Sequence, residues 1–360
     1  MSTLLSETVE VDDDPFAFLA LAQAQGWSDG LPLIPPTDTR IEAMLAQTPL
    51  PSTHIVVHEL PPRHGTATVE LVAINAVMAG CEPRAFPLVL AALQAIAQPA
   101  FNAFGLATTT GSVTPMLVVN GRSRDALGID YRAGCLGGSG GRGSATIGRA
   151  VQLCLRNIGG LRAGDSSRTV FGQPARVGLC FGEWEERSDW PSLAQRRGFS
   201  ADQEVVTVHG GMGTVPVCDL STQDARELAC LIARSLAYPM NNLFVHGAVP
   251  PGEMLVLLNP LWAERLAETF PRIEDLQAHL HEEAWQAVDL WPQAMQDVMH
   301  ERGRVDAQGR VRLAGGPAQY VPVVCGGLGN LHATLLPSWG ESEIQSAAAL
   351  RLPQSTEKTT

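Results

Sequence analysis

A glycine-rich loop that runs directly into a helix, between Arg132 and Gly160, constrains this chain more than any other segment. Six of the ten residues from 134 to 143 are glycine, with a serine and an arginine among them. Glycine lets backbone N–H groups approach a partner closely, and the start of the following helix favours negative charge. The segment therefore predicts an anion-binding turn at the start of a helix.

The helix after this loop has the clearest periodicity in the chain. Ser144 is predicted to be its N-cap, and Gly159 and Gly160 to supply the left-handed residue that ends it. Its apolar stripe is formed by residues at helical spacing, namely Ile147, Val151, Cys154 and Ile158.

The glycines match G-x-G-x-x-G, but the surrounding sequence excludes two nucleotide-binding motifs. A dinucleotide fingerprint needs a strand directly before the loop, whereas "RSRDALGIDYRA" separates the two. A phosphate-binding P-loop needs lysine before its serine, and here Gly143 occupies that position. A generic anion or carboxylate cradle remains, and a flexible surface loop is the alternative. The predicted substrate-binding residues are Gly138, Ser139, Gly140, Arg142, Ser144 and Arg149, with Gly327 and Asn330 from a second glycine turn.

Two related segments indicate two related lobes. "TPMLVVNGRSRDALG" and "GEMLVLLNPLWAERLA" each give an apolar strand, an asparagine turn and an amphipathic helix. We therefore predict an α/β fold with two related lobes of mixed sheet flanked by helices. The turns Gly137–Gly143 and Gly326–Gly329 would converge at the interface between the lobes, where pockets are common.

The predicted domains follow from composition and breaks in the pattern. Residues 1–14 are expected to be disordered, because they are acidic and carry no apolar period. The expected parts are 1–24 with a disordered start and short helix, 25–200 as the N-terminal lobe with the glycine loop, 201–340 as the C-terminal lobe, and 341–360 as a flexible tail.

Charge and cysteine usage limit the function classes. The formal net charge is −12, which argues against nucleic acid or an anionic membrane as a partner. Seven scattered cysteines predict free thiols in a reducing compartment. The start has no secretory pattern and no apolar run reaches membrane-spanning length, so we expect a cytoplasmic protein, and a homodimer.

Two cysteines and one histidine are candidate catalytic residues. Cys325 ends an apolar strand before a glycine turn, and His332 follows in position to activate a thiol. A buried structural role for Cys325 stays open. Cys135, inside the glycine loop, is the better candidate for a reactive thiol. Glu183 begins an acidic, tryptophan-containing loop and is expected to face a pocket.

Three histidines are the only metal-ligand candidates that the sequence suggests. On the strand predicted for residues 54–60, His54 and His58 share one face, and His64 follows shortly afterwards. This spacing is not specific, and an exposed polar face is the alternative.

Several segments together resemble a known bacterial family. They are "GWSDGLPLIPPT", "PPRHGTATVELVAINAVMAGCEP", "SATIGRAVQLCLRNIGGLRAGD" and "FGQPARVGLCFGEWEERSDWPSLAQRRGF". In this order they resemble the UGSC-type (seleno)proteins over roughly residues 25–340. The family label implies thiol or selenol chemistry in some members.

We therefore expect an enzyme, a lyase that breaks or forms a carbon–heteroatom bond in a small anionic metabolite. The loop amides and Arg142 would hold the anion, and Cys135 or Cys325 with His332 would supply the nucleophile or the acid and base. A metal-dependent lyase or hydrolase with His and Glu ligands is one alternative. A non-catalytic protein that binds a small anion is the other. The sequence does not identify a cofactor.

Overall fold

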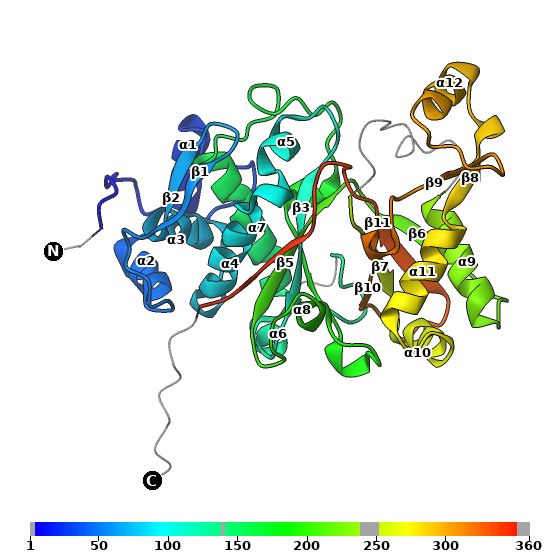
Figure 1. Ribbon diagram of the computed structural model, residues 1–360. Coiled ribbons are helices and arrows are strands. Elements are labelled where there is room, and N and C mark those ends of the chain that lie inside the picture. The colour runs from blue at the N-terminus through cyan, green and yellow to red at the C-terminus, as the bar shows by residue number, and fades with distance from the viewer. Residues whose placement is uncertain (1–3, 138–140, 238–251, 351–360) are drawn as a thin grey trace, which may run out of the picture.

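Two four-stranded mixed sheets form the centre of the protein (Figure 1). The computed structural model describes residues 4–137, 141–237 and 252–350. The first sheet has the order β12-β5-β3-β4, with strands β3 (Thr114–Asn120), β4 (Leu179–Gly182), β5 (Val205–Gly211) and β12 (Gln345–Ala348). The second has the order β10-β7-β11-β6, with strands β6 (Val215–Cys218), β7 (Met254–Leu258), β10 (Tyr320–Val324) and β11 (His332–Leu336).

The two sheets have the same strand pattern. In each, one parallel pair, β3 with β4 or β7 with β10, is followed by two antiparallel neighbours. Strands β3 and β7 are buried over their whole length, as expected for continuous apolar runs in the middle of a sheet. The predicted α/β fold with two lobes of mixed sheet is confirmed.

The edge strands are exchanged between the lobes. After β5 the chain crosses to the second sheet as β6, and after β11 it crosses back to the first sheet as β12. The two crossing segments pair with each other at Gly211 and Ser338. Beside this bridge, the amide of Met212 donates to the carbonyl of Pro337 at 2.8 Å. The exchange links the two sheets through backbone hydrogen bonds.

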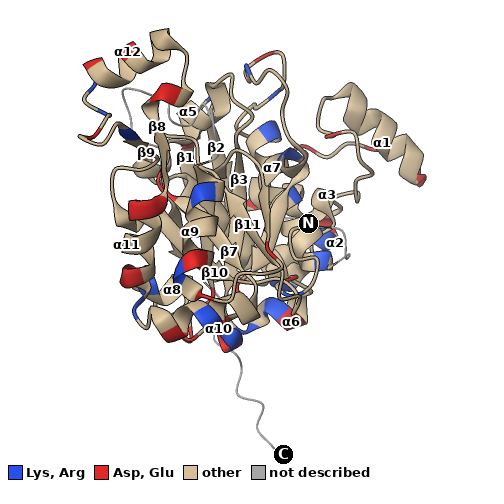
Figure 2. Cartoon of the chain, turned by 90° about the vertical axis from the view of Figure 1, so that its right-hand side faces the viewer, with Lys and Arg blue, Asp and Glu red and all other residues tan. Residues whose placement is uncertain are grey.

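The sheets face each other, and helices cover their outer sides (Figure 1). Inward side chains of both sheets form one buried cluster that includes Met116, Phe181, Leu257 and Val323. Charged residues lie mainly on the helices and loops, and the strands carry few (Figure 2). The first sheet is covered by α3 (Val69–Ala79), α4 (Phe86–Ile96) and α7 (Arg142–Asn157), and the second by α9 (Ala225–Leu236), α10 (Pro260–Thr269) and α11 (Ile273–Glu283).

Smaller elements surround these layers. A hairpin of β1 (Ile55–Leu60) and β2 (Gly65–Thr68) precedes α3, and β8 (Trp285–Ala287) pairs with β9 (Arg310–Arg312) beside the second lobe. The remaining helices are α1 (Pro15–Ala24), α2 (Asp38–Leu45), α5 (Ala103–Thr108), α6 (Ser123–Leu127), α8 (Leu193–Arg196) and α12 (Gln293–Glu301).

Three predicted boundaries need correction. The boundary at residue 200 does not separate the lobes, because β5 begins after it and pairs with β3 in the first sheet. The segment 341–360 is not a free tail over its described part, because β12 pairs with β5. The start is also held, since the amides of Leu5 and Ser6 donate to the Glu70 carboxylate at 3.0 and 2.8 Å. Periodicity alone does not reveal such long-range pairings.

Within the described residues, no single helix is long and apolar enough to cross a membrane. The segments Pro83–Ile96 and Pro99–Thr108 together reach that length and composition, with a bend of 76° between them.

The exchanged strand β12 can be tested by truncation. A chain that ends at Leu350 keeps β12 and serves as the reference. A chain that ends at Glu343 loses the β12 hydrogen bonds and the buried side chain of Ile344. We expect it to lose about 3 kcal/mol or more of unfolding free energy. Thermal and urea unfolding measure the difference, and equal stability of the two chains would contradict the exchange.

Candidate active site

Two thiols from different lobes meet between the sheets. Cys135 lies in the loop between α6 and α7, and Cys325 directly follows β10. Both are buried, with exposed fractions of 5% and 3%. Both belong to the buried cluster between the sheets, and a hydrogen bond from Cys325 lowers the pKa of Cys135. The two cysteines predicted as separate alternatives thus form one pair.

The hydrogen bond makes the two thiols unequal. Donation from Cys325 is the main cause that lowers the pKa of Cys135, and the amide of Gly326 lowers it further. The same hydrogen bond, together with burial, raises the pKa of Cys325. Of the two thiols, Cys135 is therefore the one that ionises more readily.

Backbone hydrogen bonds hold the two cysteine segments side by side. The amide of Gly326 donates to the carbonyl of Tyr131 at 2.9 Å, and the amide of Cys325 donates to Leu258 at 2.9 Å. A Cβ atom on Gly327 would lie 3.2 Å from the Cβ of Ala133, so glycine permits this close approach. Gly326 and Gly327 of the second glycine turn thus lie beside Tyr131 and Ala133, which precede the predicted turn Gly137–Gly143.

A buried carboxyl group lies near the thiols. Glu183 follows β4 and is 1% exposed. Its carboxylate accepts hydrogen bonds from the side-chain amide of Asn120 and the backbone amide of Leu193, each at 2.7 Å. Burial raises the pKa of Glu183, and its charge in turn raises the pKa of Cys325. Glu183 is thus a buried carboxyl group whose charge acts on Cys325.

Two further residues of this region escaped sequence reasoning. Asn120 ends β3 and is fully buried, and its side-chain oxygen has no hydrogen-bond partner among the described residues. Arg124 is 4% exposed, donates to the carbonyl of Glu183, and lies 4.7 Å from the centre of the Tyr131 ring. Their position after a parallel strand is a signal that could have identified them, because ligand sites gather at the carboxyl ends of such strands.

Arg132, three residues before Cys135, lies 3.8 Å from the Asp125 carboxylate and is largely exposed. The side chain of Arg132 is 60% exposed, and its guanidinium lies 4.9 Å from the ring centre of Tyr131 and 5.4 Å from that of Trp184. It also donates to the Tyr131 hydroxyl at 2.7 Å. These contacts hold a positive charge at the surface next to the buried thiols.

The arginines and serine predicted for the anion cradle have other partners. Arg142 donates to the carbonyl of Gly80 at 3.1 Å, and Arg149 forms two hydrogen bonds with Asp29 at 2.7 and 2.8 Å. Ser144 is not the N-cap, because α7 begins at Arg142 and the Ser144 hydroxyl accepts from Asp130 instead. Gly138, Ser139 and Gly140 lie outside the described residues.

Asn330 and His332, in and after the second glycine turn, are not placed for the roles predicted for them in substrate binding and thiol activation. The side-chain oxygen of Asn330 accepts from Arg265 at 3.2 Å. His332 is exposed and begins β11, and β7 lies between β11 and the strand that ends at Cys325. Two strand spacings amount to roughly 10 Å. His332 is therefore not placed to activate Cys325.

The three candidate metal-ligand histidines do not form a ligand set. His64 stacks on Phe104 with 5.7 Å between ring centres, and it lies 3.8 Å from Glu59. His54 precedes β1 and His58 lies within it, both exposed. Over residues 4–137, 141–237 and 252–350, no three or more His, Cys, Asp or Glu side chains gather as metal ligands.

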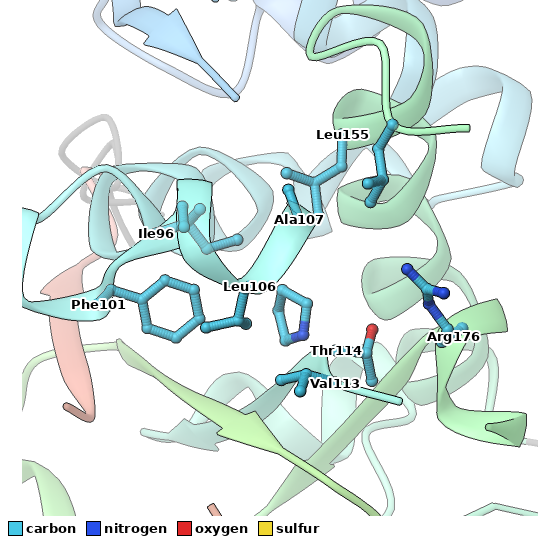
Figure 3. Close-up of a pocket in the computed structure, with 11 residues that line it drawn as sticks. Ile96, Phe101, Leu106, Ala107, Val113, Thr114, Leu155 and Arg176 are labelled. Carbon is cyan, nitrogen blue, oxygen red and sulfur yellow. The ribbon is translucent and has the colours of Figure 1, made fainter. Parts of the chain in front are cut away.

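A small cavity beside β3 is too small to hold a substrate (Figure 3). Its volume is about 20 Å³, room for one water molecule, and apolar side chains such as Ile96, Phe101 and Leu106 surround it. It is not lined by Cys135 or Cys325.

Neither the models of known protein families nor the curated protein sequences give a match to this chain.

The inequality of the two thiols predicts a pH effect. Replacing Cys325 with alanine removes the hydrogen-bond donor, so the pKa of Cys135 should rise and its thiolate should form only at higher pH. Cys325→Ser keeps an O–H donor and should titrate near the wild type. The measurements are thiolate ultraviolet absorbance and iodoacetamide alkylation against pH, with Cys218 replaced by serine in every variant because it is exposed. An unchanged Cys135 titration in Cys325→Ala would show that this hydrogen bond does not set the pKa.

Proposed function

We propose that this chain is a thiol–disulfide oxidoreductase that acts on a small anionic substrate through Cys135 and Cys325. The observation that carries the proposal is the contact between a thiol with a lowered pKa and a buried thiol that donates to it. A low-pKa thiolate attacks a disulfide, and a neighbouring thiol resolves the product. The resemblance to UGSC-type (seleno)proteins agrees with sulfur chemistry.

In the first step, the Cys135 thiolate attacks one sulfur of the substrate disulfide. A mixed disulfide forms at Cys135, and the other half of the substrate leaves as a thiolate. Cys325 then loses its proton and attacks the Cys135 sulfur. This expels the second half of the substrate and leaves a Cys135–Cys325 disulfide. The substrate disulfide is reduced to two thiols, and the protein dithiol is oxidised.

Glu183 is the group that would accept the Cys325 proton in the second step. A buried carboxyl with a raised pKa takes up a proton near neutral pH more readily than an exposed one. Asn120 and Leu193 donate to its carboxylate and hold it in place. Arg132, exposed beside Cys135, would attract the anionic substrate.

The lyase expected from the sequence is the second candidate. The buried carboxyl of Glu183 favours it, since a protonated acid can donate to a leaving group while the Cys135 thiolate takes a proton. His332 has no part in this version. In the lyase, Cys325 would serve only to lower the pKa of Cys135. Cys325→Ser keeps a hydrogen-bond donor and would therefore keep turnover.

All seven cysteines are free, which agrees with a reducing compartment, and we propose a cytoplasmic location. We also retain the homodimer as a proposal. It is supported by an exposed apolar segment in which Phe171 is 95% exposed and Val170 is 68% exposed.

Oxidised glutathione tests the redox proposal, because it is a small anionic disulfide. The reduced wild type should release two thiols per chain and gain a Cys135–Cys325 disulfide, seen by peptide mass mapping. Cys325→Ser should stop at a mixed disulfide on Cys135, and Cys135→Ser should not react at this site. Cys218→Ser, at an exposed cysteine, is the matched control and should behave as the wild type. Modification of Cys218 alone in the wild type would refute the proposal.

Arg132 gives a separate prediction about substrate charge. Arg132→Ala should slow the reaction with oxidised glutathione about three- to tenfold at low ionic strength, because the variant lacks the charge that attracts the anion. Its rate with neutral hydroxyethyl disulfide should stay unchanged, and added salt should remove the difference. Arg142→Ala is the control, because Arg142 donates to Gly80. An equal loss with both disulfides would show that Arg132 acts on structure and not on charge.

A further inference from the structure

A second cavity, unrelated to the thiol pair, lies in the first lobe. Its volume is about 730 Å³, within the range of small-molecule sites. It lies among α1, α2 and α3, the elements farthest from the second sheet (Figure 1). Its walls are mainly apolar and include Phe18, Leu21, Ile41, Leu71, Ile74 and Met78.

The N-terminal segment forms one side of this cavity. Leu4, Val9 and Val11 all line it. The segment is fastened by Glu70, whose carboxylate accepts from the hydroxyl of Ser6 at 2.6 Å as well as from backbone amides. Val9 and Val11 remain 53% and 41% exposed although they line a cavity. An apolar ligand would remove this surface from water, which favours binding.

Asn157 lines the cavity, and its side chain is fixed by hydrogen bonds within the protein. Its side-chain amide donates to Asn75 at 2.8 Å and to the carbonyl of Trp27 at 3.1 Å. Its side-chain oxygen is buried and therefore not accessible to a ligand in the cavity. The mainly apolar walls are the feature that would favour a ligand here.

The charges on the cavity lining select against anions. Glu7 and Asp38 contribute to it, and the described lining contains no lysine, arginine or histidine. A carboxylate bound here would meet like charge and no counter-ion.

From these features we propose that the cavity binds an uncharged, mainly apolar small molecule. The walls would bury its apolar surface, and the acids of the lining would disfavour an anion. This binding site is independent of the proposed thiol chemistry, because neither Cys135 nor Cys325 lines the cavity.

Binding can be measured on the full chain with N-phenyl-naphthylamine, a neutral fluorescent probe with one N–H group. The probe should give a saturable rise in fluorescence. Decanol, which is uncharged, should displace it. Decanoate at neutral pH should compete at least about tenfold more weakly than decanol.

Two substitutions on opposite walls locate the site. Leu71→Trp on α3 and Leu21→Trp on α1 should each lower the affinity for the probe at least about tenfold by filling the cavity. Two variants are used so that one remains if the other fails to fold, as judged by thermal unfolding. Phe16→Ala, on the exposed side of α1 and outside the lining, should stay within about twofold of the wild type. No saturable signal, undiminished binding in a folded tryptophan variant, or decanoate competing as well as decanol would each overturn the proposal.

Discussion

The rest of the structure depends on the pairing between the two chain segments that cross from one sheet to the other. At Gly211 and Ser338 these segments bridge each other, and each then becomes an edge strand of the opposite sheet. Backbone hydrogen bonds thereby oppose separation of the lobes. The inward faces of both sheets can then remain apolar, because each covers the other.

This arrangement also explains why the titratable groups of the proposed site lie between the sheets. Parallel strands bring their carboxyl ends to one edge, and here the ends of β4 and β10 lie close enough for Glu183 to influence Cys325. Burial makes every charge there costly and raises the pKa of Cys325, whereas the hydrogen bond from Cys325 lowers the pKa of Cys135. In a pair of thiols exposed to water, the two pKa values would differ far less.

The outer layer of the first lobe has a different character. There α1 and the N-terminal segment pack loosely enough over α3 to leave a large apolar cavity, whereas the space between the sheets is filled by side chains. The two regions therefore suit different ligands. The thiol region has Arg132 at its surface, and the cavity has apolar walls with two acids in its lining.

The sequence by itself determined the elements and the candidate thiols. Apolar runs, asparagine turns and helical stripes are encoded in adjacent residues, so the two lobes of mixed sheet could be predicted, and Cys135 and Cys325 could be named as candidates. Only the tertiary structure decided that these thiols touch, that Arg142 and Arg149 have partners within the protein, and that His332 lies away from the site. The physical reason is that such contacts depend on which strand edges and loops meet, and a local pattern carries no information about its distant partner.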